Sequence, residues 1–451
     1  MLTTMGEDSK NPPPDRLYSP FEQYEQAGTS PPATHNPPEK DAAVALISIA
    51  ELQTLIRDKL AADKQPLPVE SLPSDQAVGR VLAEDIVSPL NLPASNVSAM
   101  DGYALPVAAA AGSRWRVVGE SAAGAAFQGE LPSDGCIRIM TGAVVPDACQ
   151  CVVMQENTAR EGDILTLTQD AAAAANIRFA GEEIQTGSRV LTRGRILREA
   201  DIMLLAALGF ARVAVTRKLK VAVLSTGDEL VEPGTPLSSP AQIYDSNRHA
   251  LIARLNRLPV DIIDLGRAAD TLADTEQRLA EAAKAADVII SSGGVSVGDY
   301  DFLRTAVERI GTIHHYKVAM KPGKPFVFGG LGKSWYFGLP GNPVSGFVGF
   351  DMFVKQALWQ LAGAAELPTP LRLTATLSAP VKKSPGRADI QRAVIRQQDD
   401  GSWLAEPAGA QDSHRILGVS RANAYLILAA DSGPLPAGAS VLVQPFTEAF
   451  L

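Results

Sequence analysis

Residues 291–301 read SSGGVSVGDYD and follow the apolar run Val288–Ile290. This pattern predicts a buried strand that ends in a glycine-rich turn before a helix. Two similar turns, residues 225–229 (STGDE) and 338–345 (GLPGNPVS), also follow short apolar runs. Glycines let backbone amides approach an anion, and helix starts favour negative charge. Because turns at the carboxyl ends of parallel strands converge, the three stretches predict a site for a phosphorylated or oxyanionic ligand.

The region around these turns alternates apolar runs with helical patterns, from residue 216 to residue 366. Such alternation predicts a doubly wound α/β sheet. The expected strands and helices are Val221–Leu224, Arg248–Leu258, Val260–Leu265, Thr275–Ala286, Val288–Ile290, Phe302–Ile310, Phe326–Phe328, Trp335–Phe337 and Gly346–Leu361.

The amino-terminal part divides into three further regions. Residues 1–42 are rich in Pro, Ser and Asn without apolar periodicity, which predicts a disordered extension with no signal or transit peptide. Residues 85–184 contain short alternating runs broken by Gly, Pro and Asp, which predicts a β-rich lobe. Helical patterns on either side of the lobe predict a discontinuous linker domain, residues 43–84 and 185–215, in which Ser48 and Glu51 form a capping box. The lobe is then an insertion.

Residues 367–451 return to short alternating stretches, expected at Leu371–Leu377, Arg392–Ile395, Tyr425–Leu428 and Val441–Val443. This spacing is typical of a small antiparallel sheet or barrel. The predicted fold is therefore multidomain, with a doubly wound α/β domain, an inserted β-rich lobe, a helical linker and a carboxyl-terminal barrel-like domain.

Composition excludes several classes of protein. The chain has 451 residues, a hydrophobic share of 46% and a net charge of −9, and no apolar stretch is long enough to span a membrane. We expect a cytoplasmic protein without nucleic-acid or membrane partners, whose anionic ligand is held by a local cluster of cations. The three cysteines lack the spacing of a zinc site or a disulfide framework and are expected to be packing thiols.

One basic segment stands out in this acidic chain. Residues 317–325 read KVAMKPGKP, so that prolines and a glycine restrict the backbone that carries Lys317, Lys321 and Lys324. Clustered ammonium groups suit a dianion, and a solvated basic turn is the alternative. Carboxylates on loops of the same domain, among them Glu229, Asp245 and Asp301, are the oxygen ligands that Mg²⁺ takes together with substrate phosphates.

Polar motifs outside the α/β domain have weaker signals. Asp101 lies in a tight turn, Thr141 ends an apolar run, and Glu183 follows a cation, but each pattern also fits a structural turn or a solvated salt bridge. Arg387 and Ser413 offer a guanidinium and a hydroxyl, which are good oxyanion partners and equally fit an ordinary surface.

Eight of these motifs, in this order, resemble those of the molybdopterin molybdenumtransferases, the family that includes the carboxyl-terminal part of gephyrin. The resemblance covers Ile47 to Leu451, and the motifs are residues 98–104, 138–143, 152–157, 225–230, 243–247, 291–301, 321–325 and 338–345. It implies an elongated, L-shaped, dimeric subunit whose cleft lies between the α/β domain of one subunit and the β lobe of its partner. It also implies that molybdate is inserted into adenylylated molybdopterin, with Mg²⁺ and release of AMP.

The resemblance assigns the site residues. Asp101, acting across the dimer, Asp245 and Asp301 are the expected catalytic carboxylates, and Asp245 and Asp301 the expected Mg²⁺ ligands. Asp245, Ser296 and Asp301 resemble the family's residues at the adenylylated pterin, and Lys321, Lys324, Arg387 and Ser413 its molybdate pocket. The remaining expected substrate contacts are Thr141, Glu183, Glu229, Lys317, Pro340 and Pro343. Expected partners are molybdopterin adenylyltransferase and downstream cofactor-processing proteins.

Two departures and two alternatives accompany this resemblance. Glu183 stands where the family often has Asp, and residues 387–390 read Arg-Ala-Asp-Ile where Arg-x-Glu-Phe is more usual. A molybdopterin adenylyltransferase is one alternative, but that sibling usually carries Gly-Gly-Thr-Gly where this chain has Gly293-Gly294-Val295-Ser296. The other is a gephyrin-like scaffold, and nothing before Ile47 resembles the domains fused in such proteins.

Overall fold

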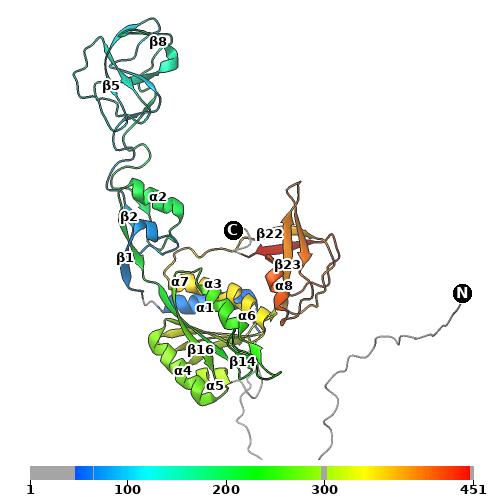
Figure 1. The fold of residues 1–451 in the computed structure, drawn as a ribbon. Helices are drawn as coiled ribbons and strands as arrows, with labels where there is room; N and C mark the ends of the chain where they lie inside the picture. The colour runs from blue at the N-terminus through cyan, green and yellow to red at the C-terminus, as the bar shows by residue number, and fades with distance from the viewer. Residues whose placement is uncertain (1–45, 64–65, 296–301, 447–451) are drawn as a thin grey trace, which may run out of the picture. The chain divides into compact units, whose positions relative to one another are not determined.

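The structure is a computed structural model that describes residues 46–63, 66–295 and 302–446 (Figure 1). The predicted extension, residues 1–42, and the predicted site residues Ser296 and Asp301 lie outside the described residues.

The α/β domain is built on a sheet with helices on both faces, as predicted, and the sheet has one strand, at residues 312–317, that was not expected. The strand order is β16 (Val260–Ala268), β13 (Leu219–Thr226), β17 (Val288–Ser292), β21 (Ser334–Leu339), β20 (Pro325–Leu331) and β18 (Thr312–Lys317). The first four strands are mutually parallel, whereas β20 runs antiparallel to both of its neighbours. The short turn between β20 and β21 makes them a hairpin, which the alternation of strands and helices did not predict.

Helices cover both faces of this sheet (Figure 1). Val221 and Val223 of β13 pack in one cluster with α1, α3, α6 and α7, whereas Ala222 and Leu224 pack in another with α4 and α5. Side chains alternate across a strand, so one buried strand supplies both cores. The helices are α1 (Ile49–Ala62), α3 (Ser246–Leu255), α4 (Leu272–Ala285), α5 (Phe302–Ile310), α6 (Pro343–Gly349) and α7 (Lys355–Leu361), with a π-helical turn, η3 (Phe350–Val354), between the last two.

The linker segments meet through two short antiparallel pairs. β1 (Val69–Pro73) pairs with β12 (Arg212–Thr216), and β2 (Ile86–Val87) pairs with β11 (Arg189–Leu191). A small core with helix α2 (Glu199–Ala207) and the turn η1 (Ser74–Gln76) joins them. The predicted capping box at the start of α1 is confirmed, but the buried face of α1 packs in the α/β core rather than in this one.

The β-rich lobe contains a second six-stranded sheet. Its order is β7 (Cys151–Met154), β4 (Gly102–Leu105), β6 (Gly135–Ile139), β5 (Arg114–Ser121), β9 (Ile164–Leu167) and β8 (Thr158–Glu161), with a separate pair of β3 (Val97–Ser98) and β10 (Ile177–Arg178) and the turn η2 (Gln155–Asn157). All three cysteines are buried here without disulfides. Burial raises the pKa of Cys136 and of Cys149 to about 12, so both are neutral packing thiols, as predicted.

The carboxyl-terminal domain is a closed five-stranded barrel, which confirms the predicted class. Its strands are β23 (Ala388–Gln397), β24 (Trp403–Pro407), β22 (Leu373–Leu377), β26 (Ser440–Pro445) and β25 (Ala424–Leu428), and β25 closes the barrel by pairing with β23. Strand β24 and helix α8 (Ile416–Arg421) were not predicted. A short strand of the α/β domain, β19 (Met320–Lys321), adds to β23 from outside the barrel.

One short strand pair completes the described fold. β14 (Leu230–Val231) and β15 (Ile243–Tyr244) form a parallel pair just before α3. No helix in the described part of the chain has the length and hydropathy needed to cross a membrane.

Candidate functional site

The three turns identified from the sequence meet at one edge of the α/β sheet. They follow β13, β17 and β21, which are adjacent parallel strands. Asn247 at the start of α3 donates its side-chain amide to Ser292 Oγ at 2.8 Å and to the Gly341 carbonyl at 2.7 Å. The Gly293 amide donates to the Leu339 carbonyl at 3.1 Å. The three turns therefore begin at the same edge of the sheet, and hydrogen bonds join those that follow β17 and β21.

Gly293 is required by this close approach. Its φ is +94°, and a Cβ added there would lie 2.7 Å from the Thr226 carbonyl oxygen, which is backbone and cannot move aside. Gly293→Ala is expected to lower the free energy of unfolding by about 2–4 kcal/mol through strain and overlap. Gly332→Ala is the control, because Gly332 has φ +61° with nothing within 4 Å, and about 1 kcal/mol is expected. Urea unfolding measures both, and equal losses would contradict the steric argument.

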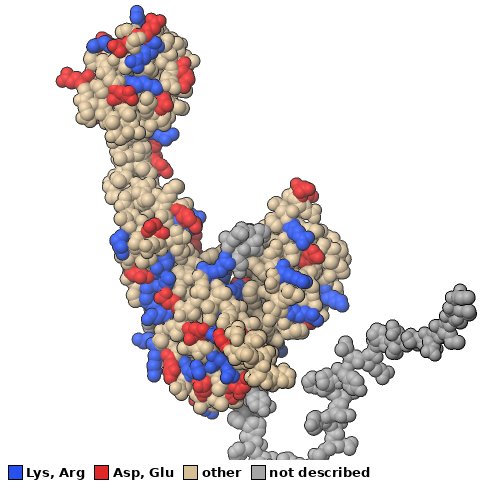
Figure 2. Space-filling view, viewed as in Figure 1, with Lys and Arg blue, Asp and Glu red and all other residues tan. Residues whose placement is uncertain are grey.

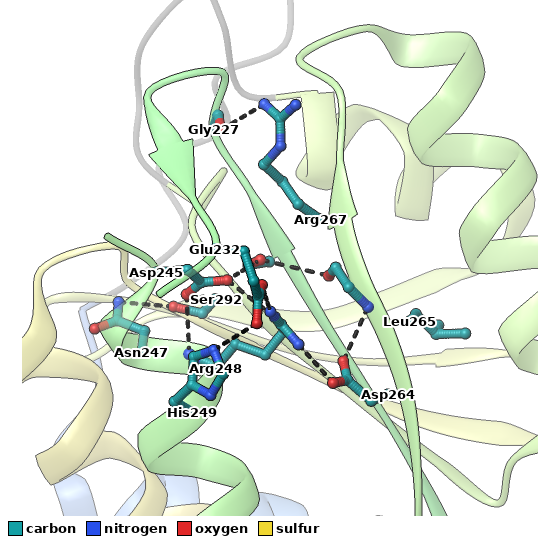
Figure 3. A network of polar contacts seen from close by, with 12 residues as sticks. Gly227, Glu232, Asp245, Asn247, Arg248, His249, Asp264, Leu265, Arg267 and Ser292 are labelled. Atoms are coloured by element: carbon teal, nitrogen blue, oxygen red, sulfur yellow. Dashed lines mark hydrogen bonds and ion pairs between the residues drawn. The ribbon is translucent and has the colours of Figure 1, made fainter. Parts of the chain in front are cut away.

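Asp245, a predicted catalytic and Mg²⁺-binding carboxylate, is buried at this edge. It caps α3 by accepting from the Arg248 amide at 3.1 Å, and its Oδ2 accepts from Ser225 Oγ at 2.5 Å and from Arg248 Nε at 3.0 Å. Arg248 also donates to Asp264 at 2.5 Å and to Glu232, so that one buried guanidinium contacts three carboxylates (Figure 3). The carboxylate of Asp245 is thus fixed in place and partly neutralised.

The described residues do not form a metal site at this edge. No three His, Cys, Asp or Glu side chains of residues 46–63, 66–295 and 302–446 converge in an arrangement that would hold a metal ion. Glu229 lies at the exposed tip of the turn after β13, and its carboxylate lies over Gly227. Oδ1 of Asp245 accepts one hydrogen bond, from the main-chain amide of Arg248. A carboxylate oxygen has a further lone pair, which could face a cation.

The predicted cations gather in a second place, a cleft of about 830 Å³ between the α/β domain and the barrel. Its walls include five predicted site residues, namely Lys321, Lys324, Pro340, Arg387 and Ser413. They come from four separate stretches of the sequence. The prediction that these residues share one site is consistent with this cleft.

The lysine-containing segment, residues 317–325, is held by a hydrogen bond within itself and by pairing with a strand of the barrel. The Val318 amide donates to the Lys324 carbonyl at 2.9 Å. β19 lies beside β23 in parallel, and in this register Lys321 is opposite Asp389. The ammonium of Lys321 lies 3.9 Å from the buried carboxylate of Asp389, which also accepts from Gln391 at 3.0 Å. Asp389 is thus the acidic partner of a lysine that is predicted to bind the oxyanion.

The cleft also contains side chains that the sequence argument missed. Ser345 and Gln391 are buried polar residues of its wall, and His414 and Lys382 line it as well. Ser345 ended a quoted motif and could have been included, because hydroxyls at helix starts often face anions. Gln391 lies beside the stretch that supplies Arg387, Lys382 lies between two predicted strands, and neither was selected as a site residue.

Two predicted substrate contacts lie beside the cleft rather than in its wall. The ammonium of Lys317 lies 4.7 Å from the centre of the Tyr316 ring, in a cation–π contact. Pro343 begins α6 and lines a neighbouring apolar cavity of about 190 Å³ together with Asn247 and Ser292. That cavity lies next to the glycine-rich turns, so Pro343 belongs to the turn side of the site.

The β lobe contains a separate polar cluster in which two predicted residues touch. Asp101 Oδ1 accepts from the Thr141 amide at 2.7 Å and from Thr141 Oγ1 at 2.8 Å. Arg138 donates to the Gly102 carbonyl and to Gln155, which places a cation nearby. The hydrogen bonds from Thr141, followed by the charge of Arg138, lower the pKa of Asp101, so this exposed carboxylate is ionised at neutral pH.

Thr141→Val is expected to raise the pKa of Asp101 toward its usual value of about 3.9, because one of the two donors is lost. Because the pKa of Asp101 is lowered in the folded state, its contacts stabilise the fold at pH values above the pKa of the unfolded state. This stabilisation is lost as the pH falls through the folded-state pKa. NMR titration of the Asp101 carboxyl measures the shift. Thr186→Val, whose hydroxyl bonds to Asn91, is the control and leaves the pKa of Asp101 unchanged. An unaltered titration in Thr141→Val would contradict the assignment.

Glu183 lies on the exposed loop after β10, where its amide donates to the Leu92 carbonyl at 3.1 Å. The hydrogen bonds of Asp101, Thr141 and Glu183 all join residues within the predicted lobe segment. Their relation to the cleft and to the glycine-rich turns therefore stays a prediction. On the face shown in Figure 2, Lys and Arg are interspersed with Asp and Glu.

Comparison with known proteins assigns each region of the chain to a family. Residues 47–209 match the MoeA N-terminal region (domain I and II), residues 222–360 a probable molybdopterin binding domain, and residues 374–446 the MoeA C-terminal region (domain IV).

Relatives cover most of the chain. A molybdopterin molybdenumtransferase from Haemophilus influenzae is 41% identical over 385 residues, which are 85% of this chain and 95% of the relative. Molybdopterin molybdenumtransferase 2 from Mycobacterium tuberculosis is 35% identical over 414 residues, 89% of this chain and 100% of the relative. The solved molybdopterin biosynthesis MoeA protein from Pyrococcus horikoshii matches 89% of this chain and 100% of its own, with 29% identity and a TM-score of 0.75. The chain therefore belongs to the molybdopterin molybdenumtransferases, transferase enzymes of molybdenum cofactor biosynthesis.

Proposed function

We propose that this protein inserts molybdate into adenylylated molybdopterin with Mg²⁺-dependent release of AMP. The observation that carries the proposal is the cleft in which Lys321, Lys324 and Arg387 gather in a chain of net charge −9. A cluster of three cations in an acidic protein requires a counter-charge, and molybdate is a tetrahedral dianion of suitable size for lysines and a guanidinium.

The cleft can lower the barrier to the reaction by neutralising charge. Molybdate must exchange an oxide ligand for the dithiolene sulfurs, and the two thiol protons leave with that oxide as water. Fixed cations that face the anion reduce repulsion between molybdate and the sulfurs without reorganising during the reaction. The roles of Lys321, Lys324, Arg387 and Ser413 are thus to bind the oxygens and hold them beside the pterin.

The nucleotide end of the substrate is assigned to the glycine-rich turns. Backbone amides at the ends of β13, β17 and β21 can approach a phosphate, and Asn247 holds these turns together. Asp245, Asp301, Glu229 and Ser296 are proposed to contact the adenylylated pterin, with Asp245 and Asp301 as the protein ligands of Mg²⁺. The ion would neutralise phosphate charge, in keeping with its preference for one or two carboxylates plus substrate phosphates.

We further propose that the enzyme is a homodimer with shared sites. Asp101, Thr141 and Glu183 lie in the β lobe, and a cleft completed by the partner's lobe gives each of them a role. The ionised, exposed carboxylate of Asp101 is suited to orient a nucleophile or to stabilise positive charge across such an interface. The substrate would come from a molybdopterin adenylyltransferase, and the product would pass to cofactor-processing proteins.

The test is a reconstitution with purified components. Protein supplied with adenylylated molybdopterin, molybdate and Mg²⁺ is expected to release AMP and to yield a cofactor that activates an apo-molybdoenzyme. Omission of molybdate, or removal of Mg²⁺ with EDTA, is expected to stop formation of that cofactor. Failure of the complete mixture to activate the apoenzyme overturns the proposal. Synthesis of adenylylated molybdopterin from ATP and molybdopterin would instead identify an adenylyltransferase.

A further inference from the structure

Arg392 is a buried charged residue whose role neither the motifs nor the proposed function explains. It lies in β23, its side chain is fully buried with 0% exposure, and it is among the largest side chains buried to this degree. Arg392 itself does not line the oxyanion cleft, but the loop of residues 409–414 does. A buried guanidinium is costly unless its surroundings use its charge and its donors.

The side-chain hydrogen bonds of Arg392 all hold that loop. Its Nη2 donates to the Ala410 carbonyl at 2.7 Å and to the Asp412 carbonyl at 3.3 Å. Its main chain exchanges two hydrogen bonds with the Gln411 side chain, at 2.8 and 3.1 Å. Three successive residues before Ser413 are thus fixed by one residue of the barrel. The Ser413 carbonyl in turn accepts from the Val344 amide at 3.1 Å, which ties the loop to the start of α6.

The charge of Arg392 is not cancelled by a contacting carboxylate. Within residues 46–63, 66–295 and 302–446, Nε and Nη1 have no hydrogen-bond acceptor, and no carboxylate lies within ion-pair distance. The carboxylate of Asp412 is engaged by Arg415 at 2.8 Å instead. Burial lowers the pKa of Arg392, but an arginine stays protonated in proteins. Its charge is therefore available to an anion on the other side of the loop.

The packing around Nε shows that the guanidinium is held closely. A Cβ added at Gly418 of α8 would lie 3.2 Å from Arg392 Nε and 3.1 Å from the Ala408 carbonyl oxygen. Glycine at 418 thus lets α8 approach the guanidinium. Any larger residue would have to displace Arg392 or the strand end beside it.

We propose that Arg392 is a positioning residue for the oxyanion: it fixes the loop that presents Ser413 to the cleft and adds a buried positive charge behind it. This inference rests on the proposed function, since the anion is the molybdate of that reaction. Loss of the side chain removes the support and the charge together, so both effects weaken anion binding.

Equilibrium dialysis of the full chain with molybdate tests the inference. Arg392→Met keeps the length of the side chain and removes its donors and charge, and an increase of about tenfold or more in the molybdate Kd is expected. Arg392→Lys keeps the charge and one donor and is expected to recover part of the loss. Affinity for adenylylated molybdopterin, measured on the same samples, is expected to be unchanged. A structural defect alone would weaken both ligands.

Arg396→Met is the matched control. Arg396 lies on the same strand with its side chain 70% exposed, 3.9 Å from Glu406, and the molybdate Kd of this variant is expected to stay within about twofold of wild type. If Arg392→Met does not fold, Gly418→Ala replaces it, because that variant keeps Arg392 and shifts it. Wild-type molybdate affinity in a folded Arg392→Met or Gly418→Ala protein overturns the inference. If the wild-type chain binds no molybdate, the proposed function fails, and this inference fails with it.

Discussion

Replacement of both Lys321 and Lys324 by Met is expected to lower kcat/KM for molybdate by about 100-fold or more. Each lysine places an ammonium on the wall of the cleft, and loss of a hydrogen bond to a charged group costs about 1.5–3 kcal/mol. Two such losses correspond to roughly two to four powers of ten. Initial rates of cofactor formation at varied molybdate, with adenylylated molybdopterin saturating, measure the effect.

The single variants and a control sharpen this test. Lys321 is the weaker donor in the free enzyme because Asp389 lies 3.9 Å from its ammonium, so Lys324→Met is expected to have the larger effect of the two. Lys333→Met removes an exposed lysine from the turn between β20 and β21, outside the cleft, and is expected to leave kcat/KM unchanged. A double variant with the molybdate dependence of wild type would show that the cleft does not bind the anion.

Asp101→Asn is expected to lower kcat by about 10²–10⁴-fold while substrate binding changes little. The replacement keeps the size of the side chain and its bonds to Thr141 in part, but removes a charge that the surrounding donors keep ionised. Loss of a preorganised charge that faces the reacting atoms typically has an effect in the lower part of this range. Single-turnover AMP release measures the chemical step, and Asp134→Asn, another exposed lobe carboxylate with 68% of its side chain accessible, is the control.

Mixed dimers test where Asp101 acts. A heterodimer of Asp101→Asn and Asp301→Asn chains is expected to have about half of the activity of a wild-type dimer, because one of its two clefts then has both carboxylates. Each homodimeric variant is expected to stay inactive under the same assay. Recovery of no activity in a verified heterodimer would place Asp101 and the α/β carboxylates on the same chain.

Strands buried on both sides were predictable, because β13 and β17 are short apolar runs followed by glycine. Ser48 and Glu51 likewise predicted the start of α1, since a capping box is purely local. The hairpin of β20 and β21 was missed because adjacent apolar runs do not specify whether the next strand is parallel. Strand β24 was missed because Trp403–Pro407 is too short and mixed to stand out from a loop.

The candidate site was only partly predictable for a different reason. Lys321, Lys324, Arg387 and Ser413 were selected by chemistry and by resemblance, but their meeting in one cleft depends on β19 adding to a strand 68 positions later. Asp245 was expected as a metal ligand, and its bonds to Arg248 and Ser225 appear only in three dimensions. Arg392 is buried because the 409–414 loop and α8 cover the face of β23 on which it lies, and this contact appears only in three dimensions.

The most direct measurement is the position of molybdenum in a crystal soaked with molybdate, from anomalous scattering at the molybdenum edge. One strong peak is expected in the cleft, within hydrogen-bond reach of the side chains of Lys324 and Arg387, and this peak is expected to disappear in the Lys321→Met, Lys324→Met variant. A molybdenum peak elsewhere on the molecule, or an ordered cleft that stays without one at saturating molybdate, would contradict this expectation.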